Sequence, residues 1–260
     1  MALRIKLTLQ FDGTDFVGWQ VQPNGRSVQA EMCSALESLL GKTAVTGAGR
    51  TDSGVHALMY CCHADIADGE RFARIGAERL PAALNARLPR DIAVLSACEA
   101  GDGFHARYSV RSKTYVYNFL NSAQRSPFWD RWSWRPACRL DAGRMDAVAQ
   151  AFVGRHDFAG FMAAGSAIAE RGGSAVREMF GGSVTECGEL VRFRIRGDGF
   201  LYNMVRIMAG TLVRCCGERY REWEPDRRRA ELEAVIASRD RARAGPTLPA
   251  RGLVLEKIEY

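Results

Sequence analysis

The residues with the clearest chemical potential lie in the segment Gly47–Ala57, which reads GAGRTDSGVHA. Its carboxylate, Asp52, follows Arg50 by two residues and lies among glycines at 47, 49 and 54. Glycines at that density let the backbone turn sharply and approach a ligand closely. Arg50 adds a cation that can contact phosphate or enter a base stack. A carboxylate on a tight loop beside such an arginine indicates chemistry on a nucleotide.

Two phosphate-binding motifs do not fit this loop. Residues 49–54 have the glycine spacing of a Walker loop, but Val55 and His56 stand where Lys and Ser or Thr are needed. A dinucleotide fingerprint fails as well, because Asp52 occupies the place of its third glycine. The hexapeptide GRTDSG at 49–54, taken alone, favours a glycine-rich turn in which Asp52 caps a helix or bonds to its own backbone.

A hydrolase triad built from Ser53 and His56 is also disfavoured. A triad needs side chains that converge in space, and neighbours within five positions seldom do so. We therefore expect both residues to serve the structure of the loop and of the strand that follows.

The composition is that of a globular protein of 260 residues, with 47% hydrophobic and 25% charged residues. This length suits one large or two ordinary domains. No run reaches the length of a membrane span, and MALRIKLTLQF lacks the apolar core of a signal peptide. We expect a cytoplasmic protein without membrane contact.

The eight cysteines predict no metal site and no disulfide. They form no C-x-x-C motif, and Cys61, Cys62 and His63 are too close in sequence to close a tetrahedral site by themselves. Free cysteines of this kind usually act as small core residues.

The net charge is +6, and the 36 basic residues are 32 Arg and 4 Lys. Arginine suits phosphate and base stacking better than lysine does. Genomic base composition can favour arginine in the same way, so charge alone favours a nucleic-acid partner only weakly.

The first half of the chain alternates strands and helices. Residues 3–11 alternate apolar and polar side chains, which predicts a half-buried strand. Residues 27–40 repeat apolar positions Val28, Met32, Ala35, Leu36 and Leu39 and end at Gly41, which predicts a helix. Further elements are a strand at 55–63, a helix within 72–87 and a strand at 92–97.

The second half repeats this order. We predict strands at 114–120 and 191–196, an amphipathic helix at 141–152, a buried helix at 200–216, a surface helix at 225–238 and a strand at 253–260. In the strand 191–196, Val, Phe and Ile alternate with three arginines. The pattern predicts an α+β fold of two ferredoxin-like (RRM-like) domains with largely antiparallel sheets, packed side by side around a cleft. We place the domains at 1–105 and 106–260.

Four ordered blocks resemble the tRNA pseudouridine synthase A family, and the likeness runs nearly end to end. The blocks are FDGTDFVGWQVQPNG at 11–25, GRTDSGVHA at 49–57, FHARYSVRSKTYVY at 104–117 and GDGFLYNMVRIMAG at 197–210, with GRHDFAGF and GPTLPARGLVL as further matches. Phe11 stands where the family usually has Tyr. The segment 162–177 is rich in Ala and Gly, so the sequence does not define the length and order of this loop.

The resemblance implies roles for five residues. Asp52 would be the nucleophile, Arg206 its charge partner, and Tyr115 the ring that stacks on uracil. Arg50 would fill the space of a nucleotide flipped out of its stack, and Leu201 would pack beneath the base. Arg206 also gives a physical reason for one arginine in an apolar helix, since a guanidinium favours the ionised carboxylate.

The resemblance further implies a cofactor-free isomerase acting on uridines 38–40 of the tRNA anticodon stem and loop, and a homodimer that shares one tRNA. It leaves open whether Asp52 attacks the sugar, attacks the base or abstracts a sugar proton. Two alternatives remain: a noncatalytic RNA-binding protein, and a glycoside or nucleoside hydrolase, which would need a second carboxylate.

A tryptophan-rich segment allows a further RNA contact. Trp129, Trp132 and Trp134 alternate with Arg125, Arg131 and Arg135 and could stack on RNA. Packing along one domain edge is the favoured interpretation.

Overall fold

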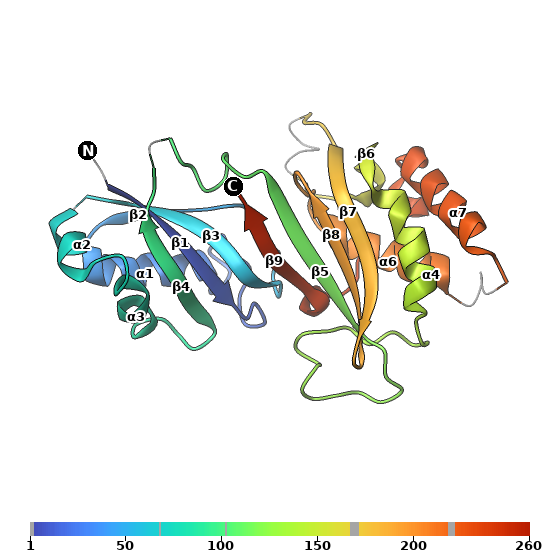
Figure 1. Cartoon of the computed structure of the whole chain (residues 1–260), viewed down its shortest axis with the longest axis horizontal. Helices are drawn as coiled ribbons and strands as arrows, with labels where there is room; N and C mark the ends of the chain where they lie inside the picture. The colour runs from blue at the N-terminus through green and yellow to red at the C-terminus, as the bar shows by residue number, and fades with distance from the viewer. Residues whose placement is uncertain (1–2, 68, 102, 167–171, 218–221) are drawn as a thin grey trace. The chain divides into compact units, whose positions relative to one another are not determined.

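The computed structural model describes residues 3–67, 69–101, 103–166, 172–217 and 222–260. The chain divides into two compact units, which Figure 1 colours along the sequence. Unit 1 comprises Met1–Arg111 and Leu255–Tyr260, and unit 2 comprises Ser112–Val254. The domain boundary that the sequence analysis placed between residues 105 and 106 stays a prediction.

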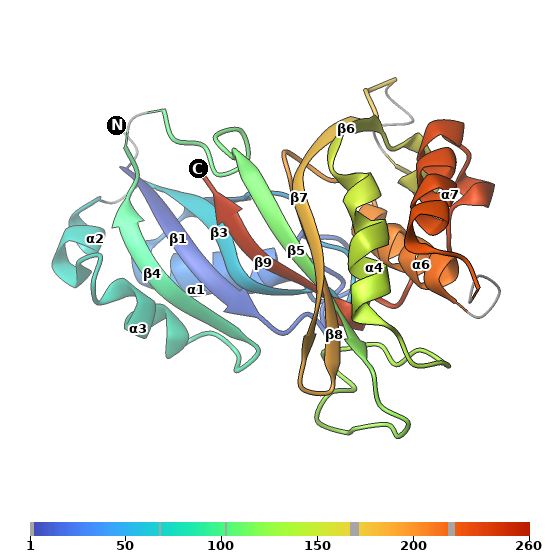
Figure 2. The ribbon, with the colours of Figure 1, turned by 45° about the vertical axis from the view of Figure 1, so that its right-hand side comes forward.

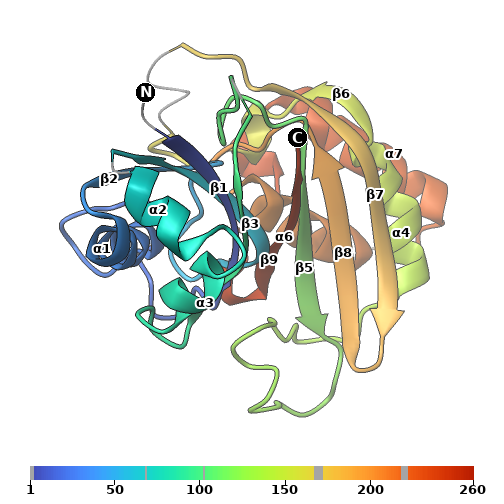
Figure 3. The same cartoon turned by 60° about the vertical axis from the view of Figure 1, so that its left-hand side comes forward.

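Unit 1 is an antiparallel sheet with its helices on one face (Figure 3). Its elements are β1 (Leu3–Phe11), α1 (Val28–Leu40), β2 (Thr43–Gly47), β3 (His56–Ile66), α2 (Gly69–Ile75), α3 (Leu80–Asn85), β4 (Ile92–Glu99) and most of β9 (Leu253–Glu259). The strands follow the order β4-β1-β3-β9, and β2 pairs with β3. The βαββαβ sequence with β4-β1-β3-β2 neighbours is ferredoxin-like.

The alternating pattern of β1 and the predicted end of α1 at Gly41 are confirmed. Ile5, Leu7 and Leu9 are fully buried on one face of β1. The hydroxyl of Ser27 caps α1 by accepting a hydrogen bond from the backbone N of Ala30 (3.3 Å). Leu40, rather than the predicted Leu39, completes the buried stripe of the helix.

Two features of unit 1 differ from the prediction. The expected helix within 72–87 is two short helices, α2 and α3, because Gly76 between them has φ +79°, outside helical geometry. Strand β2 was not predicted, since TAVTG is too short to show a clear alternation.

Unit 2 contains four antiparallel strands, of order β5-β8-β7-β6, with its helices on one face (Figure 2). Its elements are β5 (Ser112–Leu120), α4 (Ala142–Ala149), β6 (Gly154–Asp157), β7 (Val176–Cys187), β8 (Leu190–Gly197), α6 (Met204–Cys216) and α7 (Pro225–Ser238). A 3₁₀ turn at Gln150–Phe152 extends α4 to the predicted end of that helix.

The main elements of unit 2 confirm the sequence pattern. Val191, Phe193 and Ile195 of β8 are fully buried, while the arginines between them are not. Helix α6 is largely buried but begins at Met204, later than predicted. Strands β6 and β7 were not predicted. Strand β7 begins within the segment 162–177, of which residues 167–171 lie outside the described part of the chain.

The two units share one connectivity. Unit 1 runs β1, α1, β2, β3 with β1 and β2 flanking β3. Unit 2 runs β5, α4, β6, β7, β8 with β5 and β7 flanking β8, so it differs by the added strand β6. The α+β class with largely antiparallel sheets is therefore confirmed. The described helices include none that is both long and apolar enough to span a bilayer.

Candidate active site

Two buried rings hold the start of the Asp52 loop. The Tyr60 hydroxyl donates a hydrogen bond to the carbonyl of Gly49, and Trp19 stacks on Tyr60 with ring centroids 4.2 Å apart. Gly47 touches both rings so closely that an added Cβ would lie 2.2 Å from Tyr60 Oη and 2.4 Å from Trp19 Nε1. Glycine is therefore required at 47 for the loop to reach this position.

The second half of the loop is fixed by the segment that follows β1. Gly54 N and Ser53 Oγ both donate to the carbonyl of Phe16, each at 3.2 Å. A Cβ on Gly18 would lie 2.3 Å from the carbonyl oxygen of Thr51, so the two segments are in close backbone contact. Asp52 is consequently presented by a loop that both neighbouring segments immobilise.

Asp52 and Arg50 differ in exposure. Asp52 is half-buried, which leaves its carboxylate neither sealed in the core nor in bulk solvent. Arg50 is exposed, and its Nε donates to Gln20 Oε1 over 3.3 Å. This arrangement suits a fixed acid group and a cation that can reach outward.

Ser53 and His56 have structural roles, as predicted. His56 is only 2% exposed, and its Nδ1 accepts a hydrogen bond from Gly13 N at 3.0 Å. The same nitrogen lies 3.1 Å from Asp12 Oδ1. His56 therefore joins the start of β3 to the loop after β1, and its Nδ1 faces that loop.

In unit 2, Arg206 is oriented by two neighbours. It lies in the first turn of α6, where its Nε donates to the carbonyl of Leu248 at 2.7 Å and its guanidinium also donates to Asn203 Oδ1. Asn203 adopts a left-handed conformation (φ 59°) directly before α6. Arg206 is half-buried, and its side chain is held at two points rather than projecting freely into solvent.

Tyr115 and Leu201 lie near the same end of α6. Tyr115 of β5 is 8% exposed and packs edge-on against Phe200, with centroids 5.0 Å apart. Leu201 is 5% exposed, and its backbone N points to Met204 Sδ at 3.4 Å. Both side chains contribute apolar surface next to the segment that precedes α6.

The predicted site residues thus fall into two groups. Asp52 and Arg50 belong to unit 1, and Tyr115, Leu201 and Arg206 belong to unit 2. Sequence reasoning assigned no role to the residues that orient them, namely Tyr60 for the Asp52 loop and Asn203 for Arg206. An asparagine directly before an apolar helix is a usable signal for Asn203, whereas the contact of Tyr60 depends on the fold of β3.

The cysteines of β3 are core residues, as expected. Cys62 is fully buried and Cys61 is 3% exposed, and burial raises the pKa of both thiols. Within the described ranges, no three His, Cys, Asp or Glu side chains are grouped so that they could hold a metal ion.

The tryptophan-rich segment is packed in part. Trp134 exchanges backbone hydrogen bonds with the end of β5, to Asn118 and Leu120 (both 3.0 Å), and its ring contacts Phe119. Trp129 is 38% exposed and Phe128 is 87% exposed. The favoured packing role is confirmed for Trp134.

Comparison with known proteins gives one consistent result. A family model described as tRNA pseudouridine synthase matches residues 8–109 and 148–260. A tRNA pseudouridine synthase A of Moorella thermoacetica is 43% identical over 98% of this chain and 99% of its own length. Proteins of the same name from Bacillus pumilus (39% identical, 99% of each chain) and Myxococcus xanthus (41% identical, 99% of this chain and 92% of its own) agree. This chain belongs to the tRNA pseudouridine synthase family.

Proposed function

We propose that this chain isomerises uridine to pseudouridine at positions 38–40 in the anticodon stem and loop of tRNA, with Asp52 as the nucleophile. The observation that supports this most is the Asp52 loop. Its backbone is held by Tyr60 and Phe16, and its single carboxylate remains half-buried rather than covered. Family membership supplies the reaction and the class of substrate.

The reaction needs no external atom other than exchangeable protons. The bond between N1 of uracil and C1′ of ribose breaks, the base turns, and a new bond joins C5 to C1′. The proton on C5 is released, and N1 takes up a proton. A site for this chemistry needs an ionised nucleophile, a surface that retains the detached base, and exclusion of water.

Each site residue has a part in that scheme. Asp52 attacks or abstracts, and Arg206 favours its ionised form because a neighbouring guanidinium stabilises a carboxylate. Tyr115 stacks on the uracil, and Leu201 packs beneath it. Arg50 occupies the space that the flipped nucleotide leaves in the RNA.

The assembly is part of the proposal. We propose a cytoplasmic homodimer in which two subunits bind one tRNA, as the family resemblance implies. Sedimentation of the protein with and without tRNA measures this directly: a two-to-one complex supports it, and a one-to-one complex with full activity contradicts it.

One experiment tests the activity and its nucleophile. The purified protein is incubated with EDTA, without added cofactor, on tRNA carrying tritium at C5 of uracil. The wild type should release tritium, and Asp52→Asn should release none while still binding tRNA. Asp226→Asn is the matched control, because Asp226 is an exposed aspartate in the first turn of α7.

The other outcomes identify the alternatives. Tight tRNA binding without tritium release by the wild type would indicate a noncatalytic RNA-binding protein. Accumulation of free uracil would indicate a hydrolase. Equal loss in Asp52→Asn and Asp226→Asn would remove Asp52 as the specific nucleophile.

A further inference from the structure

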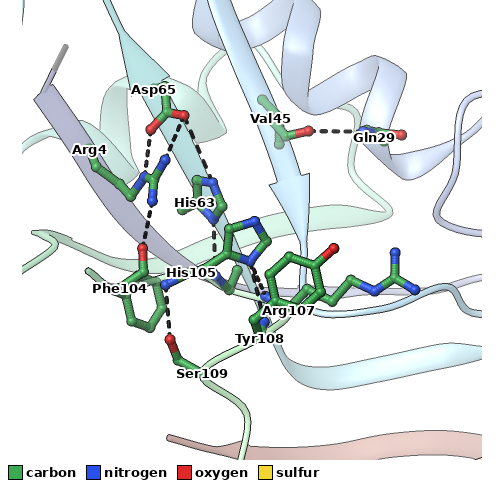
Figure 4. A network of polar contacts seen from close by, with 11 residues as sticks. Arg4, Gln29, Val45, His63, Asp65, Phe104, His105, Arg107, Tyr108 and Ser109 are labelled. Atoms are coloured by element: carbon green, nitrogen blue, oxygen red, sulfur yellow. Dashed lines mark hydrogen bonds and ion pairs between the residues drawn. The ribbon is translucent and has the colours of Figure 1, made fainter. Parts of the chain in front are cut away.

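One aromatic ring of unit 1 is exposed although its surroundings are rigid. Tyr108 is 78% exposed and lies in a turn before β5. Figure 4 shows its ring beside His105, with Arg107 on the adjoining part of the turn. The centroids of Tyr108 and His105 are 4.3 Å apart and their planes are tilted by 30°. One face of Tyr108 is thus supported by a second ring.

The supporting ring is itself fixed. His105 Nδ1 accepts hydrogen bonds from the backbone N of Arg107 (3.1 Å) and of Tyr108 (3.3 Å), and the backbone N of His105 donates to Ser109 Oγ (3.0 Å). Because Nδ1 accepts from two backbone donors, these contacts fix the orientation of the ring. Its rotation would break contacts within the same turn.

The stack continues into the core (Figure 4). His105 meets His63 edge-on, with centroids 4.8 Å apart, and His63 is 2% exposed. His63 Nδ1 accepts a hydrogen bond from Ala106 N at 3.0 Å. The three rings therefore run from a buried strand, β3, to the solvent-exposed Tyr108.

The backbone of the turn is held at two carbonyls, those of Phe104 and Ala106. The carbonyl of Phe104 accepts from an Arg4 guanidinium N at 2.7 Å, and that guanidinium is also paired with Asp65. The carbonyl of Ala106 accepts from the Tyr260 hydroxyl at 2.8 Å. A group that is already immobile loses little conformational freedom on binding a ligand, which favours affinity.

The charge beside the ring indicates the class of partner. The Arg107 guanidinium lies 5.9 Å from the centroid of Tyr108, and its side chain is exposed. A planar cation next to a flat aromatic face is the combination that binds unstacked bases and their phosphates. An apolar protein partner would gain little from this arginine.

We propose that Tyr108 is a stacking platform for an unpaired base of the tRNA, with Arg107 contacting the adjacent phosphate. The inference rests on the proposed function, because it takes tRNA as the ligand. It adds a binding contact on unit 1 that lies outside the Asp52 loop.

The test compares variants at Tyr108 in tRNA binding and in tritium release. Stacking of one base is worth roughly 1–3 kcal/mol, so Tyr108→Ala should raise the Kd and KM for tRNA about 5- to 150-fold. The kcat at saturating tRNA should stay unchanged. Tyr108→Trp should keep wild-type affinity, and Tyr108→Leu, which is apolar but not aromatic, should behave like Tyr108→Ala. Arg107→Ala should weaken binding and reduce its dependence on salt.

The matched control is Leu95→Ala, which removes another exposed apolar side chain (46%) from the same unit and should leave Kd unchanged. Thermal unfolding should be the same for all of these variants, because the ring is mostly in solvent. An unchanged Kd in Tyr108→Ala would overturn the platform, even if the sedimentation of the variant changed. This result requires an active wild type, so it is distinct from a failure of the proposed function, in which the wild type releases no tritium.

Discussion

Arg206 illustrates how one side chain can be fixed before any substrate binds. Its planar guanidinium donates to the carbonyl of Leu248 and to the side chain of Asn203. A lysine carries the same charge but cannot make this pair of directed contacts. The orientation of the cation, and not merely its presence, is therefore built into the start of α6.

The role proposed for Arg206 predicts that Arg206→Lys lowers kcat about 100-fold, because a misdirected cation would stabilise the reacting carboxylate less well. Tritium release at saturating tRNA measures this. Arg214→Lys is the matched control: Arg214 lies in the same helix, and its guanidinium donates to the backbone carbonyls of Arg243 and Ala244. Equal losses of kcat in the two variants would contradict a special role for Arg206.

Among the elements, the Asp52 loop depends on close backbone contact more than on its own side chains. Gly47 lies against Tyr60 and Trp19 with no space for a methyl group. Overpacking such a contact typically costs about 1–3 kcal/mol and displaces the neighbouring chain. The geometry at Asp52 is therefore sensitive to a residue five positions away.

We predict that Gly47→Ala lowers the melting temperature and reduces kcat by at least roughly tenfold, since about 1 Å of misplacement can cost that much and more. Gly101→Ala is its control, because a Cβ there meets nothing within 4 Å. Differential scanning calorimetry and tritium release give the two measurements. A fully active Gly47→Ala enzyme would show that the loop tolerates the shift.

The sequence predicted elements well where side-chain periodicity was strong. The strand at 3–11 and the helix at 225–238 have the predicted bounds, because apolar spacing or helix-forming composition continues through the whole element. Strand β2 has five residues, and the strands β6 and β7 contain glycines or weakly alternating residues, so their pairing depends on neighbours in the fold.

The site residues stay a prediction, and side-chain periodicity did not identify them. Asp52 and Arg206 were assigned through the family resemblance, because local context alone favoured a simple turn at Asp52. The contacts of Tyr60 with Gly49 and of Arg206 with Leu248 join residues 11 and 42 positions apart, and no local pattern predicts them. The stack of His63, His105 and Tyr108 depends on tertiary contacts in the same way.

For the whole molecule, His63 makes stability depend on pH. Burial, together with the nearby Arg4, lowers its pKa from 6.5 to about 4. Below pH 6.5 the unfolded chain binds a proton at this position that the folded chain does not, so the free energy of unfolding falls as the pH drops from about 6.5 to 4. The stabilisation is fully present above pH 6.5.

In the wild type, the free energy of unfolding should fall by roughly 1–3 kcal/mol as the pH drops from about 6.5 to 4. We predict that His63→Asn, which keeps an acceptor for Ala106 N, does not show this fall. Urea unfolding at pH 4.5 and 7.5 measures it, since the variant should show the smaller difference between the two values. The Asp65 pair with Arg4 lowers the pKa of that carboxyl and acts at still lower pH. An identical pH dependence in variant and wild type would contradict the role of His63.

The last strand has a consequence for biosynthesis. Residues 255–260 belong to unit 1, whereas the intervening residues 112–254 form unit 2. Translation is vectorial, and domains tend to fold as they emerge from the ribosome. Strands β1–β4 of unit 1 are synthesised first, whereas β9 can join β3 only after residues 112–254 have been made. A chaperone would therefore have its longest opportunity on the older half of the polypeptide.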